Sequence, residues 1–180
     1  MKYIRWALLG LLALVCAAAA SLWIMGMRDG ADSMANRIEI DKPVSVVWAY
    51  LEDPAKTKAW VGWLKEIKHL TPGNKGVGAK EIWVMEDRNN GGKEMEINSE
   101  VTAFEPLKYV ALNLSSNEAF TGTAAYRFEA LGANRTAVTV TGTYRFTNSF
   151  ASFMQPLIMR MAGGKMKEDL QRLKTLAEKE

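Results

Sequence analysis

The sequence predicts an α+β protein in which a curved antiparallel sheet wraps around one long C-terminal helix, behind an N-terminal transmembrane helix. Three observations predict this fold class. The first is an uncharged apolar run over residues 6–27. The second is a series of segments in which apolar and polar residues alternate, as they do in strands with one buried face. The third is a change to helical periodicity from Phe150 onward.

Length and composition fit one globular domain with a short N-terminal addition. The chain has 180 residues, of which 48% are hydrophobic and 24% are charged, and common domains have roughly 100 to 200 residues. Lys2 and Arg5 precede the apolar run and account for most of the net charge of +3. The remainder is close to neutral, so we expect no nucleic-acid partner. Cys16 is the only cysteine, which excludes an intrachain disulfide.

The apolar run is long enough to cross a membrane. It has about 22 uncharged residues, and a helix needs about 20 to cross the hydrocarbon core. We predict a cytoplasmic end over residues 1–5, a transmembrane helix over residues 6–27 and a linker over residues 28–34. A cleaved signal peptide is the alternative, because the alanines at 18–20 offer a cleavage site before Ser21. Cleavage there would leave an apolar tail unburied, which favours an uncleaved signal anchor.

The charges beside this run predict its orientation. Lys2 and Arg5 lie on its N-terminal side, whereas residues 28–32 on the other side carry mixed charges. The positive-inside rule then keeps the short N-terminal end in the cytoplasm and the domain outside. We therefore expect a single-pass, membrane-anchored protein, in the inner membrane with its domain in the periplasm if the source is bacterial.

A strand and two short helices are expected at the start of the domain, which we place over residues 35–180. The strand covers residues 34–40, where the side chains alternate between two faces. Pro43 suits the first turn of a helix, and the apolar residues that follow it share one stripe. Asp53 and Pro54 indicate a cap and first turn of a second helix, which ends near Trp60 or Gly62.

Strands and one long helix complete the domain. Turn-forming residues separate the strands, most clearly Gly91 and Gly92 in "DRNNGG". From Phe150 onward apolar residues recur with helical spacing, with a bend or restart expected at Pro156 and a looser segment at the two glycines 163–164. This helix is long enough to cover the concave face of the sheet. The strands are expected over residues 66–70, 79–85, 93–104, 107–114, 120–131 and 135–146.

This order of elements resembles the START-like superfamily, also called SRPBCC, and within it the polyketide cyclase/dehydrase and lipid transport family. The similarity extends over roughly residues 35–178. It implies the helix-grip fold, with a hydrophobic ligand in a cavity between the sheet and the C-terminal helix. Residues 35–180 would then be a START-like ligand-binding domain; the transmembrane start is not part of the family pattern. The resemblance is carried by "IEIDKPVSVVWAYLEDPAKTKAW", Trp63, "TGTAAYRFEAL", "RTAVTVTGTYRF" and "LQRLKTLAEKE".

Small residues beside large ones mark a candidate ligand-binding face on the last two strands. Glycines at 122 and 142 share a face with tyrosines, which indicates either a close helix approach or space for a ligand. The family resemblance favours the cavity. Flexible methionines suit a pocket that accepts apolar molecules, although they are also common in cores. The candidate ligand-binding residues are Trp83, Met85, Met95, Ser99, Leu112, Gly122, Ala124, Tyr126, Gly142, Tyr144, Met154, Ile158 and Met161.

Signals for catalysis are few. His69 is the only histidine and has no evident partner in the sequence, so a role on the surface or on an edge strand is favoured. We predict no catalytic residue, no metal site and no cofactor. The sequence favours a membrane-tethered binding protein for a hydrophobic small molecule, such as a lipid, quinone or isoprenoid-like compound. Two alternatives stay open: a cyclase- or hydrolase-type enzyme that uses the same pocket, and an envelope protein-interaction module. The sequence does not identify a protein partner.

Overall fold

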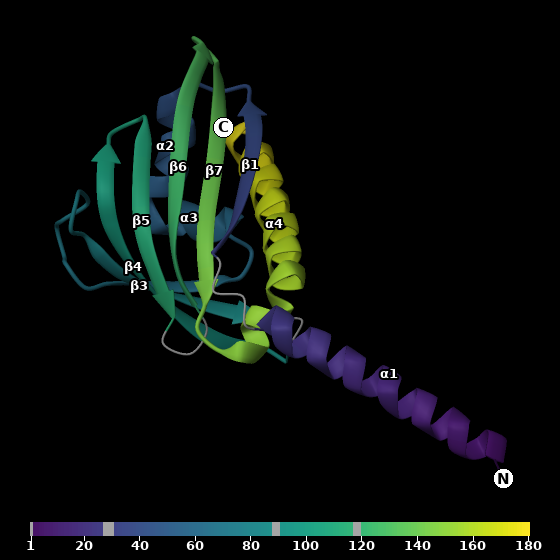
Figure 1. Ribbon diagram of the computed structural model, residues 1–180. Coiled ribbons are helices and arrows are strands. Elements are labelled where there is room, and N and C mark those ends of the chain that lie inside the picture. The colour runs from purple at the N-terminus through teal and green to yellow at the C-terminus, as the bar shows by residue number, and fades with distance from the viewer. Residues whose placement is uncertain (1, 27–30, 88–90, 117–119) are drawn as a thin grey trace.

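The computed structural model describes residues 2–26, 31–87, 91–116 and 120–180. In chain order the elements are α1 (Lys2–Gly26), β1 (Asp32–Ile40), α2 (Val44–Glu52), α3 (Pro54–Trp60), β2 (Leu64–His69), β3 (Lys80–Asp87), β4 (Lys93–Glu105), β5 (Tyr109–Ser116), β6 (Phe120–Gly132), β7 (Arg135–Phe146) and α4 (Ser149–Ala177). The strands form a 7-stranded antiparallel sheet in the order β1-β7-β6-β5-β4-β3-β2. The sheet curves beside α4, while α1 extends away from the domain (Figure 1). This architecture confirms the predicted α+β helix-grip fold.

The two short helices form where the sequence predicts them. Pro54 lies in the first turn of α3, where its missing N–H is tolerated. Asp53 caps this helix, since its Oδ1 accepts hydrogen bonds from the backbone N–H groups of Ala55 at 2.8 Å and Lys56 at 3.4 Å. Together α2 and α3 connect β1 at one edge of the sheet to β2 at the other edge.

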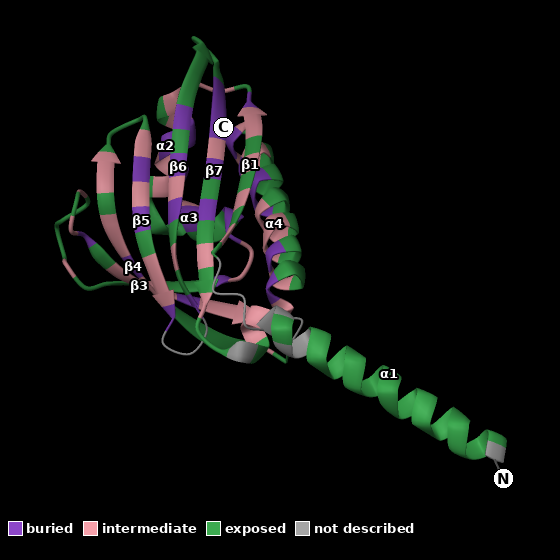
Figure 2. Cartoon of the chain, in the orientation of Figure 1, coloured by how far each residue is buried: buried purple, intermediate pink, exposed green. Residues whose placement is uncertain are grey.

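Trp48 packs α2 against the sheet. Its ring centroid lies 5.0 Å from that of Phe128 in an edge-on arrangement and 5.8 Å from that of Phe104. Trp48 is only 2% exposed, and Val47 beside it is fully buried. The buried positions lie along the middle strands and on the sides of α2 and α3 that face them (Figure 2). The two short helices thus close the curve of the sheet with a large buried apolar surface.

The helix α4 is one continuous element that includes Pro156. Of the bend or restart expected at this proline, no restart is seen, because the helix continues through Pro156 although the residue cannot donate a backbone hydrogen bond. Asn148 caps the helix by accepting a hydrogen bond from the backbone N–H of Ala151 at 2.7 Å. The C-terminal half of α4 lies in the core through Leu170, Leu173 and Ala177, each at most 2% exposed.

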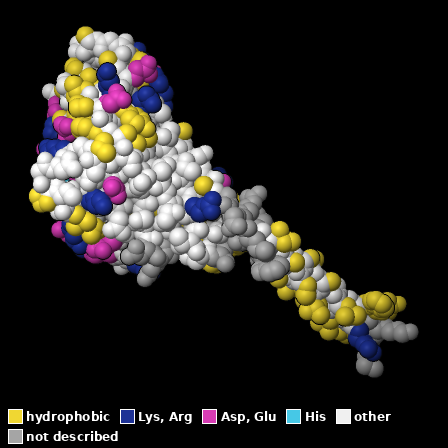
Figure 3. Space-filling model, turned by 60° about the vertical axis from the view of Figure 1, so that its left-hand side comes forward, with side chains coloured by type: hydrophobic (Ala, Val, Ile, Leu, Met, Phe, Trp, Pro, Cys, Tyr) yellow, Lys and Arg dark blue, Asp and Glu magenta, His cyan; other side chains and the backbone are white. Residues whose placement is uncertain are grey.

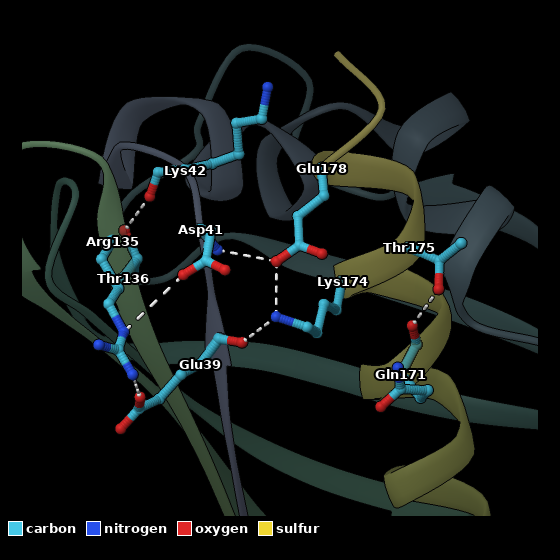
Figure 4. A network of polar contacts seen from close by, with 9 residues as sticks. All are labelled: Glu39, Asp41, Lys42, Arg135, Thr136, Gln171, Lys174, Thr175 and Glu178. Carbon is cyan, nitrogen blue, oxygen red and sulfur yellow. Dashed lines mark hydrogen bonds and ion pairs between the residues drawn. The ribbon is translucent and has the colours of Figure 1, made fainter.

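A polar network fixes the end of α4 to β1 (Figure 4). Glu178 Oε1 accepts hydrogen bonds from the backbone N–H of Asp41 at 2.8 Å and from Lys174 Nζ at 2.5 Å. Lys174 Nζ also donates to the carbonyl oxygen of Glu39 at 2.7 Å. These contacts lower the pKa of the Glu178 carboxyl, first through the Asp41 N–H and then through Lys174. The carboxylate form of Glu178 therefore favours the docked position of α4.

The described side chains of α1, at residues 3–21 and 24, are exposed and, apart from Arg5, uncharged (Figures 2 and 3). Its segment Tyr3–Ser21 is long and apolar enough to cross a membrane, and a signal sequence has the same properties. The helix begins at Lys2, so most of the predicted cytoplasmic end, residues 1–5, is helical. The strand β1 begins at Asp32, three residues before the predicted start of the domain at residue 35. Residues 28–30 of the predicted linker and residues 88–90 of the predicted hairpin turn lie outside the described residues.

Candidate functional site

A cavity of about 380 Å³ lies between the short helices, the inner face of the sheet and the connection of residues 70–79. Small-molecule pockets usually have volumes of about 300 to 1,000 Å³. Its apolar lining comes from α2, α3 and strands β3 to β5. The apolar residues are Trp48, Leu51, Pro54, Pro72, Ala79, Trp83, Val101, Phe104, Val110 and Leu112, and the other lining residues are Glu52, His69, Thr71, Gly73, Asn74, Lys75 and Glu81.

This cavity is not at the position that the family resemblance implied for a ligand. That expectation placed the ligand between the sheet and the C-terminal helix. None of the described residues of α4 lines this cavity, because α2 and α3 cover this part of the sheet. Trp48, which is only 2% exposed, borders the cavity as well.

The polar residues of the lining include a histidine–carboxylate pair. His69 Nδ1 lies 2.9 Å from Glu81 Oε1, and Trp83 Nε1–H donates to Glu81 Oε2 at 2.8 Å. His69 and Glu81 are direct partners in the β2–β3 register, and Glu81 pairs in turn with Ser99 on β4. The sequence indicated no side-chain partner for His69. The structure corrects this, because the register of β2 and β3 brings Glu81 opposite it.

Two of the predicted ligand-binding residues line the cavity. They are Trp83 on β3 and Leu112 on β5. Ser99 lies on the same face of the sheet, 5% exposed and next to Glu81, but it does not border the cavity itself. The structure therefore brings these three residues together on strands β3 to β5.

The predicted residues on β6 and β7 lie elsewhere and pack closely. A Cβ atom on Gly142 would lie 2.6 Å from Tyr144 Cε2, and one on Gly122 would lie 2.4 Å from the carbonyl oxygen of Thr143 and 2.8 Å from Tyr144 Cδ1. The Tyr144 ring thus takes the space that both glycines leave, and it stacks edge-on against Phe120 with centroids 5.5 Å apart. The expectation that these glycines open space for a ligand is not met at this position.

Ala124 and Tyr126 are buried beside these glycines. Ala124 pairs directly with Gly142 and is 6% exposed, as is Tyr126. Burial raises the pKa of the Tyr126 hydroxyl well above its usual range, and burial also raises the pKa of the Tyr144 hydroxyl. Both phenols therefore stay protonated at neutral pH and well above it.

The remaining predicted residues do not form a group around the cavity. Met85 and Met95 pair with each other on β3 and β4, where Met95 is 38% exposed. On α4, Met154 and Ile158 are half-buried and Met161 is 62% exposed. Met85 packs against the core, whereas Met95 and Met161 are on the surface. None of these five residues borders the described cavity.

A second polar cluster connects α4 to the segment between α3 and β2. Asp169 is 5% exposed, and its Oδ1 accepts from the backbone N–H of Gly62 at 3.1 Å and from Arg172 at 3.2 Å, with Lys165 also bound. Arg172 donates further to the carbonyl oxygen of Trp60 at 3.0 Å. Within the described ranges, no group of three or more His, Cys, Asp or Glu side chains could hold a metal ion.

The architecture defines a class of proteins in which a curved antiparallel sheet encloses a C-terminal helix and two short helices. Within that class, the family described as polyketide cyclase / dehydrase and lipid transport matches residues 31–178, and the chain belongs to this family. No curated protein matches the chain.

Solved structures show the same fold at low sequence identity. The Zhui aromatase/cyclase from a Streptomyces species has a TM-score of 0.69 and 13% identity, covering 83% of this chain and 94% of that one. A START superfamily protein from Mycobacterium smegmatis has a TM-score of 0.68 and 14% identity, covering 83% and 99%. A conserved protein from Geobacillus kaustophilus has a TM-score of 0.68 and 15% identity, covering 82% and 96%. These similarities concern the fold alone.

Proposed function

We propose that this protein is a membrane-tethered binding protein for a hydrophobic small molecule, such as a lipid, quinone or isoprenoid-like compound. The observation that carries the proposal is the cavity of about 380 Å³ beneath α2 and α3. Its lining includes the aromatic residues Trp48, Trp83 and Phe104. Rigid aromatic side chains offer a large apolar surface to a guest molecule, while the few polar groups can orient it.

The tether in this proposal is α1. Residues 27–31 connect the end of α1 to the start of β1, and a chain of that length spans at most about 18 Å. A membrane-inserted α1 would hold the domain close to the bilayer surface, outside the cytoplasm according to the positive-inside rule. A ligand taken from the adjacent bilayer would then reach the cavity over a short distance.

A binding measurement tests the proposed ligand site. Native mass spectrometry of the full-length, detergent-extracted protein, combined with lipid analysis, should find a bound apolar molecule that Val101→Phe reduces, because Val101 lines the cavity. A surface variant such as Lys108→Phe, outside the cavity lining, serves as the matched control. Binding that Val101→Phe leaves unchanged would contradict the proposed location of the ligand.

The tether has its own test. Full-length protein should remain in the membrane fraction after carbonate washing, with an unprocessed N-terminus, because α1 is apolar along Tyr3–Ser21. Recovery of a soluble form that begins at Ser21 would show that the segment is a cleaved signal peptide. The binding function of the domain would survive that result.

A cyclase- or hydrolase-type enzyme is the second candidate, favoured by the His69–Glu81 pair at the cavity. A histidine held by a carboxylate is a common general base. An aryl ester that the protein hydrolyses, with turnover lost in His69→Gln while the ester still binds, would support this candidate. Absence of turnover together with stable binding supports the carrier.

A further inference from the structure

His69 lies on the inner side of the sheet, at the border of the cavity. It follows Ile67 by two residues on β2, and Ile67 packs against the core, so both side chains project from the same face. The His69 side chain is 49% exposed. It therefore contacts solvent on one side and the cavity on the other, as a group at a cavity mouth would.

Glu81 fixes the orientation of this imidazole. Its Oε1 lies 2.9 Å from His69 Nδ1, and its Oε2 accepts a hydrogen bond from Trp83 Nε1–H at 2.8 Å. An ionised carboxylate can only accept hydrogen bonds, so the proton between the two groups sits on Nδ1. In a neutral imidazole the other nitrogen, Nε2, then has a free lone pair. Among the residues that the structure describes, none forms a hydrogen bond with His69 Nε2.

The charges around the cavity favour a neutral partner for this nitrogen. Besides His69, the charged residues of the lining are Glu52, Lys75 and Glu81. Two carboxylates and one ammonium give a mouth that does not attract an anionic head group. A hydroxyl group meets the requirements, because it donates one hydrogen bond and carries no charge.

We propose that His69 Nε2 accepts a hydrogen bond from the hydroxyl group of an otherwise apolar ligand, whose apolar part fills the cavity beside Trp48 and Trp83. The ligand class is thus a hydroxyl-bearing amphiphile, such as an alcohol or a phenol. The inference rests on the proposed binding function and specifies its ligand. Glu81 is the positioning residue, since it acts through His69, and Trp83 holds Glu81 in place while contributing to the cavity wall.

Three probes of similar shape test the inference in full-length protein held in lipid nanodiscs. The probes are 2-naphthol, its methyl ether 2-methoxynaphthalene, and 2-naphthoate, measured by equilibrium dialysis against matched nanodiscs without protein. We expect the naphthol to bind about 5- to 10-fold more tightly than the ether, the ratio that one net hydrogen bond supplies. The naphthoate should bind no more tightly than the ether.

Variants assign this preference to the histidine. His69→Phe keeps an aromatic ring without the acceptor, so the naphthol preference should disappear while the ether still binds. Glu81→Gln should reduce the preference, because an amide can also donate to Nδ1 and thereby place the ring proton on Nε2. Glu96→Gln is the matched control, because Glu96 pairs with Lys68 at 2.9 Å on the opposite face of the sheet.

The possible results separate the inference from the function on which it rests. Equal binding of naphthol and ether by the wild type, or a preference that persists in His69→Phe, overturns the role of His69 but leaves a hydrophobic binding protein. Tighter binding of the naphthoate shows that the site takes anions and also overturns the inference. No binding of any probe contradicts the proposed function itself. Unfolding curves of each variant show whether a lost preference reflects lost structure.

Discussion

The two sides of the curved sheet use their inner surface in different ways. We call β1, β6, β7 and α4 the packed side, and β2 to β5 with α2 and α3 the cavity side. On the packed side, residues such as Ile40, Val138 and Val140 are at most 2% exposed, and the Tyr144 ring lies against two glycines. On the cavity side, Val101 and the aromatic residues line a space of about 380 Å³.

The difference shows that small residues do not by themselves mark a ligand site. The glycines at 122 and 142 lie beside the ring of Tyr144, which is on the same strand as Gly142 and pairs with Gly122 on the next strand. The cavity is lined instead by large side chains that α2, α3 and residues 70–79 hold apart. The cavity therefore lies where α2 and α3 cross the strands, whereas the space beside the two glycines is filled by the Tyr144 ring.

The largest effect is expected from Gly142→Phe on the packed side. A Cβ at this position would lie 2.6 Å from Tyr144 Cε2 and 2.9 Å from Tyr144 Oη. Displacing the partly buried Tyr144 ring should lower the free energy of unfolding by about 3 kcal/mol, the upper end of the usual cost of overpacking. Denaturant unfolding measures the change. Gly132→Ala is the control, because a Cβ there meets no atom within 4 Å, and equal stability of both variants would refute close packing at Gly142.

Asp169→Asn should have the next largest effect. Asp169 is 5% exposed and binds Lys165, Arg172 and the backbone of Gly62. Removing its charge leaves two cations without their buried partner, so we expect a loss of about 2 kcal/mol in the free energy of unfolding. Chemical denaturation with the exposed neighbour Glu168→Gln as control checks this. Two variants of equal stability would show that the cluster contributes little to the docking of α4.

Glu178→Gln should cost about 1 kcal/mol at neutral pH, because it weakens the hydrogen bonds from Asp41 and Lys174. The folded protein lowers the pKa of this carboxyl, so its contribution is complete above the pKa of an unfolded glutamate. The contribution is lost as the pH falls through the lowered pKa of the folded state. Stability curves of wild type and variant should therefore converge in acid; a difference that stays constant with pH would argue against this linkage.

The smallest effect on stability is expected from Val101→Phe on the cavity side. The added ring can occupy the cavity that Val101 lines, so the free energy of unfolding should change by less than about 1 kcal/mol, while apolar ligands bind about tenfold more weakly. Val140→Phe is the matched substitution on the packed side, where the residue is 2% exposed, and overpacking there should cost about 1 to 3 kcal/mol. If Val101→Phe costs as much as Val140→Phe, the two sides do not differ as described.

The sequence predicts the elements of this fold well because their signals are local. Alternation identified the strands, and the cap at Asp53 and the helical spacing after Phe150 located the helices. Pro156 indicated a bend or a restart without deciding between them, and the structure shows one helix that continues through this residue.

The candidate site is less accessible from sequence because it depends on contacts between distant segments. The pairing of His69 with Glu81 requires the β2–β3 register, which includes a bulge between Leu64 and Glu66. Alternation does place His69 on the same face as Ile67, so its inward position was available as a signal. Nothing local reveals that the Tyr144 ring fills the space beside Gly142, because that follows from the side-chain conformation of a neighbour.

The strand order also limits the order in which the strands can pair during folding. The strand β1 is made first and lies at the edge of the sheet, where its only neighbour is β7, the last strand to be made. As the chain becomes available for folding from its N-terminal end, β2 to β7 can pair one after another as hairpins, but β1 has to wait until residue 146 is available. Until then its apolar face is open to other chains. Final closure of the domain is thus a late step that joins the two ends of the sheet-forming sequence.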